Sequence, residues 1–257
     1  MTDSTRIPIP GTWNFRPAGA TVDVAILAPG RLFRSDAIDA LGDIGRAELV
    51  SLGVTTVVDL RSAEEVAAHP DDIAGSAMDG LTVPIFTGSA ADYASLDPSA
   101  FGLATVYGIM TSRSGDTIAA ALRAVAGAPG ASLVHCTAGK DRTGVVVALA
   151  LTVAGATRDE IAADYAQSEG FLAGEWADRF RVRAQVYGWT IEPGPAEELA
   201  FRSPESAIRG ILAELEERHG SIDAYLDEIG FDESDRAALR TTLATPIAET
   251  AVAAPVD

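Results

Sequence analysis

Short runs of β-branched and apolar residues mark the strands that the sequence predicts. Residues 54–60, with the sequence VTTVVDL, are apolar at most positions, as in a buried strand. Residues 131–135 form a second run of this kind, and residues 81–85 form a third. The first thirty residues carry four prolines around residues 14–16, which favours turns joined by short strands.

Helical spacing of apolar residues is found through much of the remaining chain. Ile118, Leu122 and Val125 share one face of a segment that Gly127 and Pro129 close. Ser62 is followed three residues later by Glu65, the pattern of a helix N-cap. The predicted helices cover residues 43–52, 116–126, a segment from 157 onward, 204–219 with Pro204 at the first helical position, 221–229 and 234–243.

Residues 145–154 are apolar on every side and need a separate argument. The three consecutive valines at 145–147 favour a strand by propensity. The length of the run and its position after a glycine-containing loop favour a buried helix. We therefore predict a strand, a tight loop and a buried helix in succession, which makes the core α/β.

Composition and charge narrow the class of protein. The chain has 257 residues, 47% of them hydrophobic and 22% charged, which fits one domain over 1–257 with its core at about 11–243 and a flexible tail at 244–257. A net charge of −18 argues against nucleic-acid binding. The longest apolar stretch, residues 144–155, is shorter than the roughly 20 residues that cross a bilayer. Without a signal sequence, we expect a cytoplasmic location, with signal-less export left open.

The only cysteine begins the most informative segment, residues 135–144 with the sequence HCTAGKDRTG. Cys136 is followed by five residues and then Arg142, a spacing that lets the amides of Thr137, Ala138, Gly139, Lys140, Asp141 and Arg142 surround an anion. The helix that follows adds its positive N-terminal end, and the Arg142 guanidinium closes the ring. Gly139 permits the positive φ or the close approach that such a loop requires.

The same positive surroundings act on the thiol. Helix N-termini and nearby cations lower a cysteine pKa from ~8.5 to ~3.5–7.5, so Cys136 is expected to be a thiolate at neutral pH. The thiolate attacks a phosphate ester, and water hydrolyses the resulting phosphocysteine. Thr143 is placed to hydrogen-bond the sulfur. No metal or other cofactor is needed, because the amides and Arg142 stabilise the charge.

Residues 135–144 resemble the signature of cysteine-based protein tyrosine phosphatases, in the GKDRTG form of a bacterial branch that includes phosphoinositide-active enzymes. Residues 14–19, 30–35, 58–65 and 203–243 are similar to further blocks of that family. The resemblance implies an α/β fold with a central, mostly parallel sheet flanked by helices. It also implies helical lid insertions and a helical C-terminus.

The leaving group needs a proton, and two aspartates compete for this role. The resemblance assigns the general acid to Asp141. Asp59 ends a predicted strand, where active-site groups of α/β folds gather, and is ranked second as an acid or as a residue that orients Arg142. His135 resembles the family residue that hydrogen-bonds nearby backbone and tunes the thiolate.

Several further residues are candidates for the pocket. Lys140 is the only lysine among 19 Lys and Arg residues, and we expect it to reach a second phosphate or an acidic part of the substrate. Arg16, Arg34 and Arg61 are candidates for the pocket mouth, with ordinary salt bridges as the alternative. Six further residues are expected to form either an apolar lid over the pocket or part of the core. They are Tyr93, Phe101, Tyr107, Met110, Phe171 and Trp176.

The leading hypothesis is a protein tyrosine phosphatase acting on a phosphorylated protein. A dual-specificity or phosphoinositide phosphatase is the first alternative, because Lys140 suits a polyanionic headgroup. A rhodanese-like sulfurtransferase also uses a cysteine in an anion-binding loop, but Arg142 and Thr143 favour phosphate. An idle phosphate-binding module would be expected to lack the nucleophile, the arginine or the acid. The oligomeric state is not predicted.

Overall fold

The computed structural model describes residues 5–23, 25–86, 102–186 and 194–247. Within these residues a five-stranded sheet in the order β1-β2-β5-β3-β4 forms the centre of the fold. Its strands are β1 (Arg16–Pro17), β2 (Leu32–Ser35), β3 (Val54–Asp59), β4 (Asp79–Thr82) and β5 (Ala131–His135). β1 runs antiparallel to β2, whereas the other neighbours are parallel. The predicted mostly parallel sheet is confirmed.

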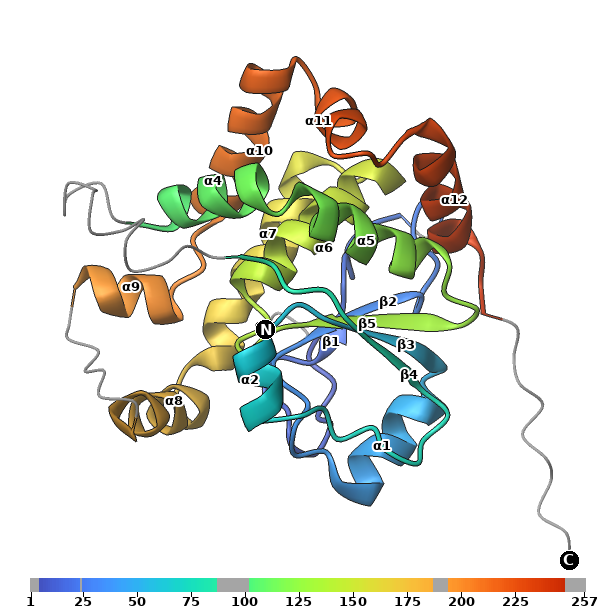
Figure 1. The fold of residues 1–257 in the computed structure, drawn as a ribbon. Coiled ribbons are helices and arrows are strands. Elements are labelled where there is room, and N and C mark those ends of the chain that lie inside the picture. The colour runs from blue at the N-terminus through green and yellow to red at the C-terminus, as the bar shows by residue number, and fades with distance from the viewer. Residues whose placement is uncertain (1–4, 24, 87–101, 187–193, 248–257) are drawn as a thin grey trace, which may run out of the picture.

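Helices flank the sheet on both faces (Figure 1). They are α1 (Gly42–Ser51), α2 (Ala63–Ala68), α4 (Leu103–Arg113), α5 (Gly115–Ala126), α6 (Asp141–Ala154), α7 (Arg158–Leu172), α8 (Glu175–Val186), α9 (Pro195–Phe201), α10 (Glu205–His219), α11 (Ile222–Glu228) and α12 (Glu233–Ala244). In the view of Figure 1, α1 lies below the sheet, and α4–α7 with α10–α12 lie above it. The helices α2, α8 and α9 lie toward the left end of the sheet.

The strand predictions hold for the two central strands and fail in position for the third. β3 and β5 cover the predicted residues almost completely. β4 begins two residues before the predicted segment 81–85 and ends at Thr82, because it is an exposed edge strand that pairs only with β3. The apolar residues Val83 and Ile85 follow the strand and turn into the core.

α6 confirms that residues 145–154 are helical in spite of their valines. The helix is buried almost throughout and packs against β5, α7 and α12. Burial on all sides outweighs the modest preference of β-branched residues for strands.

Side-chain caps fix the starts of two predicted helices. Ser62 and Glu65 form a reciprocal capping box at α2, and Thr157 and Glu160 form another at α7. Pro204 is the N-cap of α10 rather than its first helical residue, because its ψ of 138° is extended. None of the helices in the described part of the chain combines the length and apolarity needed to cross a bilayer.

Candidate active site

The segment that joins β5 to α6 lies at the carboxyl end of the central strand (Figure 1). β5 ends at His135 and α6 begins at Asp141, so the intervening residues form a loop whose last amides open the helix. In parallel α/β sheets this edge is where ligands bind. The predicted order of strand, loop and helix is therefore present.

The loop's carbonyl oxygens are held from the outside. Asn14 Nδ2 donates to the carbonyls of Ala138 (2.9 Å) and Gly139 (3.2 Å), and Arg34 Nη2 donates to Gly139 O (2.8 Å). Because the N–H of a trans peptide points opposite to its C=O, the amides that follow these carbonyls point the other way. The described residues provide no acceptor for any amide of residues 137–142. A run of unpaired amides facing one side can bind an anion.

Gly139 is required at its position for two reasons. Its φ of +65° lies in the left-handed region, as the sequence predicted. A Cβ atom there would also lie 2.1 Å from the carbonyl oxygen of Ser35, at the end of β2. The loop therefore packs so closely on β2 that only glycine fits.

The thiol of Cys136 is buried at the start of the loop, with 2% of the residue exposed. Thr143, in the first turn of α6, is fully buried, and its hydroxyl makes no hydrogen bond to any described residue. The predicted bond from Thr143 to the sulfur is thus not formed in this structure. Its role toward the sulfur stays a prediction.

Arg142 is fixed by a carboxylate that the sequence analysis did not assign to the site. Its Nη1 and Nη2 donate to the two oxygens of Glu65, at 2.6 and 3.0 Å. Burial alone would lower the pKa of Arg142, but the hydrogen bonds and charge of Glu65 outweigh burial and raise it. Nη2 also lies 3.3 Å from the hydroxyl of Thr137, so the guanidinium is held beside the loop.

Glu65 serves two elements at once. It closes the capping box of α2, and it accepts hydrogen bonds from Arg142 and from the Thr137 hydroxyl. Burial would raise its pKa, but these bonds dominate and lower it to about 2. The capping pattern explains Glu65 locally, so nothing in the sequence spacing signals its contact with Arg142, 77 residues away.

Asp141 lies in the first turn of α6 with a quarter of its side chain exposed. Its Oδ1 accepts a hydrogen bond from Tyr107 (2.7 Å) and forms an ion pair with Lys140 Nζ (2.9 Å). The Tyr107 hydroxyl is 2.5 Å from that of Tyr165. Burial and then the charge of Asp141 raise the pKa of Tyr107 well above its usual value, so this phenol remains a donor.

Lys140 does not lie where the sequence analysis expected it. The residue is fully buried, and its ammonium donates to the carbonyl oxygens of Leu199 (3.0 Å) and Arg202 (2.8 Å) in addition to its pair with Asp141. A buried ammonium needs several acceptors, and these supply them. Lys140 therefore ties the loop to the end of α9 and is not placed to bind a second phosphate.

Asp59 and Arg61 form a buried ion pair away from solvent. Arg61 Nε and Nη2 donate to the two oxygens of Asp59, and Nη2 also reaches Asp71. Burial would raise the pKa of Asp59, but Arg61 and the charge of His135 outweigh it and lower the pKa. A carboxylate held in this form is a poor proton donor, and Arg61, 2% exposed, is not open to substrate. The expectations of a catalytic Asp59 and a substrate-binding Arg61 do not fit this geometry.

His135 belongs to the same network. Its Nε2 lies 3.0 Å from Asp71 Oδ2, whereas the expected bond to nearby backbone is not formed, since Nδ1 has no partner among the described residues. Asp59, Asp71 and His135 bring ligand atoms within 4.8 Å of one another, as in a metal site. Arg61 already bridges the two carboxylates, so its guanidinium supplies the positive charge that a metal ion would supply in a metal site.

Arg16 and Arg34 also lie behind the loop rather than at a pocket mouth. Both are fully buried. Arg34 pairs with Asp164 at 2.5 Å, and Arg16 donates to Asp164 O and to Ser168. Burial and repulsion by Arg34 lower the pKa of Arg16 to about 9. Of the alternatives given for these arginines, the salt bridge is the one found for Arg34.

Of the six aromatic and methionine residues, four lie in the described part of the chain, and three of these are buried in hydrophobic clusters. Tyr107 and Met110 are fully buried in the main core. Phe171 lies under the Arg16 guanidinium, and Trp176 joins an apolar cluster on α8 and α9 that also contacts Ala138. Tyr93 and Phe101 lie outside the described residues.

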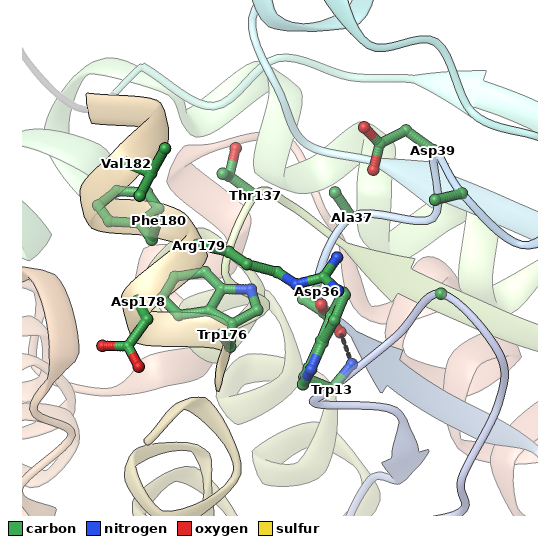
Figure 2. A pocket seen from close by; sticks show the side chains of 12 residues that line it. Trp13, Asp36, Ala37, Asp39, Thr137, Trp176, Asp178, Arg179, Phe180 and Val182 are labelled. Carbon is green, nitrogen blue, oxygen red and sulfur yellow. Dashed lines mark hydrogen bonds between the residues drawn. The ribbon is translucent and has the colours of Figure 1, made fainter. Parts of the chain in front are cut away.

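A cavity of about 530 Å³ opens beside the loop (Figure 2). Thr137 borders it, and residues of α8 form one wall. The other wall is formed by Trp13, Asp36, Ala37, Asp39 and Ala40. Figure 2 shows Arg179 reaching from α8 across to Trp13, whose ring centroid is 4.9 Å from the guanidinium carbon.

Comparisons with known proteins identify the family of this chain. A profile described as "Tyrosine phosphatase family" matches residues 7–245. The chain belongs to the tyrosine phosphatase family. It is 32% identical to the "Triple specificity protein phosphatase PtpB" of Mycobacterium tuberculosis over 277 aligned positions, covering 91% of this chain and 98% of that protein.

One further relative and one solved structure are also similar to this phosphatase. A "Tyrosine-protein phosphatase" of Nostoc commune is 32% identical, with 82% of this chain and 73% of that protein covered. Among solved structures, TpbA of P. aeruginosa is 20% identical, with a TM-score of 0.37 and coverage of 72% of this chain and 93% of that chain. The recognition made from residues 135–144 and the flanking blocks is confirmed by the family match.

Proposed function

We propose that this phosphatase hydrolyses phosphomonoesters, above all phosphotyrosine in proteins, through a phosphocysteine on Cys136. One observation carries the proposal: six consecutive amides, at residues 137–142, have no acceptor in the described part of the chain while the carbonyls beside them are held outward. Three non-bridging phosphoryl oxygens are the acceptors that such a ring of donors and Arg142 suits.

In the first step the Cys136 thiolate attacks phosphorus, an S–P bond forms and the P–O bond to the leaving group breaks. Asp141 gives its proton to the departing oxygen. In the second step Asp141 accepts a proton from water, the water oxygen attacks phosphorus, and the S–P bond breaks to release inorganic phosphate and the thiolate. Arg142, held by Glu65, binds the phosphoryl oxygens throughout.

The cations near the loop favour a substrate with a single phosphate. Lys140, Arg16, Arg34 and Arg61 are buried and already bound to protein oxygens. Arg142 has 13% of its side chain exposed and is the guanidinium left at the loop, within the described residues, for a ligand. The name of the mycobacterial relative indicates three substrate classes. For this chain we place phosphotyrosine first and polyphosphorylated lipids last.

The test is an assay of purified protein, with EDTA present, on a phosphotyrosine peptide and on phosphoinositide vesicles. Cys136→Ser is expected to abolish turnover, and Arg142→Lys to reduce it at least ~100-fold, because a point charge cannot replace the bidentate fork. Trapping of ³²P on the acid-quenched wild-type protein, and none on Cys136→Ser, would reveal the intermediate. A strict need for a divalent metal would refute the mechanism.

The setting of the enzyme is also proposed. We infer one domain over about residues 11–243, consistent with a family match that spans 7–245. We place the enzyme in the cytoplasm, because its only thiol must stay reduced to act as a nucleophile and the cytosol maintains that state.

A further inference from the structure

The cavity beside the phosphate loop is positioned to contact the same molecule whose phosphate enters the loop. Thr137 is the first residue of the proposed amide ring and also borders the cavity (Figure 2). Its carbonyl accepts a hydrogen bond from Ala37 N (3.2 Å), and Ala37 also lines the cavity. Loop and cavity are thus joined by a direct backbone contact.

The walls of the cavity are largely apolar and partly uncovered. Trp13 and Phe180 are half-buried. The apolar side chain of Val182 on α8 is 63% exposed. The small side chain of Ala40 lies on the opposite wall. Large apolar side chains exposed around a concavity indicate a binding site for an apolar group.

The charges of the cavity exclude a second phosphate. Its lining carries three carboxyl groups, Asp36, Asp39 and Asp178, against one guanidinium, Arg179. Arg179 is itself held by Glu175 at 2.8 Å and by the ring of Trp13. A dianion placed here would meet like charge, whereas an uncharged side chain would not.

We propose, resting on the function proposed above, that this cavity binds an aromatic or large aliphatic side chain of the peptide substrate, two or three residues from the phosphotyrosine. An extended peptide covers ~7–11 Å over that distance, enough to lead from the loop along α8. A volume of about 530 Å³ lies within the usual range of sites that enclose a ligand group. The side chain would cover Val182 and stack among the aromatic walls.

The test compares phosphotyrosine peptides that carry alanine, phenylalanine or aspartate at each position from −3 to +3. Wild-type kcat/KM is expected to rise about tenfold or more with phenylalanine at one position, from the burial of an aromatic ring. Val182→Asp and Ala40→Phe are expected to bring the ratio of the phenylalanine to the alanine peptide close to one. The ratio cancels any general loss of activity.

The matched controls are the same two kinds of substitution, valine to aspartate and alanine to phenylalanine, at exposed positions outside the cavity. Val50→Asp on α1 and Ala213→Phe on α10 are expected to keep the wild-type ratio. The proposal is overturned if no position favours phenylalanine, if aspartate is preferred, or if the controls lose the ratio equally. It is also overturned if Val182→Asp impairs only phosphoinositide vesicles. Failure to hydrolyse even p-nitrophenyl phosphate would instead count against the proposed function.

Discussion

Asp141 holds both of its neighbours, Tyr107 and Lys140, through the same oxygen, Oδ1. Its other oxygen, Oδ2, has no such bond to a described residue, and a quarter of the side chain is exposed. An anchored carboxyl group that is partly exposed can carry a proton to a leaving group. This arrangement supports Asp141 over Asp59 as the general acid.

Asp141→Asn is therefore expected to slow phenyl phosphate hydrolysis by ~100-fold or more and p-nitrophenyl phosphate hydrolysis much less, because only the poorer leaving group needs the proton. The two kcat/KM values measure this directly. Asp59→Asn, which breaks the pair with Arg61, is expected to affect both substrates alike. If Asp141→Asn slows hydrolysis of the two substrates by the same factor, as expected for Asp59→Asn, then Asp141 is not the general acid.

Asp36 provides a second test at the scale of one residue. Burial raises its pKa from 3.8 to about 6, although the amides of Trp13 and Asn14 donate to it. A raised carboxyl pKa means that the folded state binds the proton more tightly than the unfolded state, so the stability contribution falls as pH rises from about 4 to about 6.

Asp36→Asn removes this titration. Relative to wild type, the variant is expected to gain on the order of 1 kcal/mol in unfolding free energy between pH 5 and pH 8. Urea unfolding at both pH values gives the difference. A gain that does not change with pH would show that Asp36 is not the titrating group.

At the scale of elements, the phosphate loop depends on the N-terminal segment and on β2. Asn14 holds two loop carbonyls outward, Arg34 holds one of the same two, and Gly139 packs against the carbonyl of Ser35. The anion ring thus depends on two parts of the chain that are distant from the loop in sequence.

Asn14→Ala is expected to lower kcat/KM ~10- to 100-fold and to weaken inhibition by inorganic phosphate, because the loop amides lose their orientation. Asn14→Asp is the matched variant of equal size that lacks the Nδ2 donor, and it should be at least as impaired. Rescue by the aspartate would mean that only the volume of residue 14 matters.

At the scale of the whole molecule, the field is strongly negative. A net charge of −18 repels an anionic substrate, and most cations are buried or paired. Salt screens such repulsion over ~10 Å at 0.1 M. The local ring of amides and Arg142 must therefore hold the phosphate against the long-range field.

Raising the ionic strength about tenfold, from roughly 20 to roughly 200 mM, is expected to increase kcat/KM for an acidic phosphopeptide, because salt screens the repulsion. For a basic phosphopeptide the same change is expected to decrease kcat/KM, because salt screens the attraction. Steady-state assays with two peptides that differ only in flanking charge measure the effect. Parallel loss of both rates with salt would show that local contacts outweigh the net charge.

Much of the fold and the centre of the site follow from local pattern. The β-branched run at 54–60 predicts a buried strand, and the apolar run at 145–154 predicts a buried helix. Both can be predicted because a buried segment is rich in apolar residues. Cys136, Gly139 and Arg142 lie within seven consecutive residues, so their spacing alone indicates the anion ring. β4 was misplaced because an exposed edge strand carries a weak hydrophobic signal.

The partner of each charged side chain follows from the three-dimensional packing of distant segments. Glu65 reaches Arg142 across 77 positions, while Lys140 and Arg61 are withdrawn from substrate by Leu199, Arg202, Asp59 and Asp71. The α/β core and the phosphate loop can be predicted from sequence, because both depend on residues that are neighbours in the chain. Whether a buried cation faces ligand or protein depends on which distant acceptors the fold brings to it, and no local spacing encodes that.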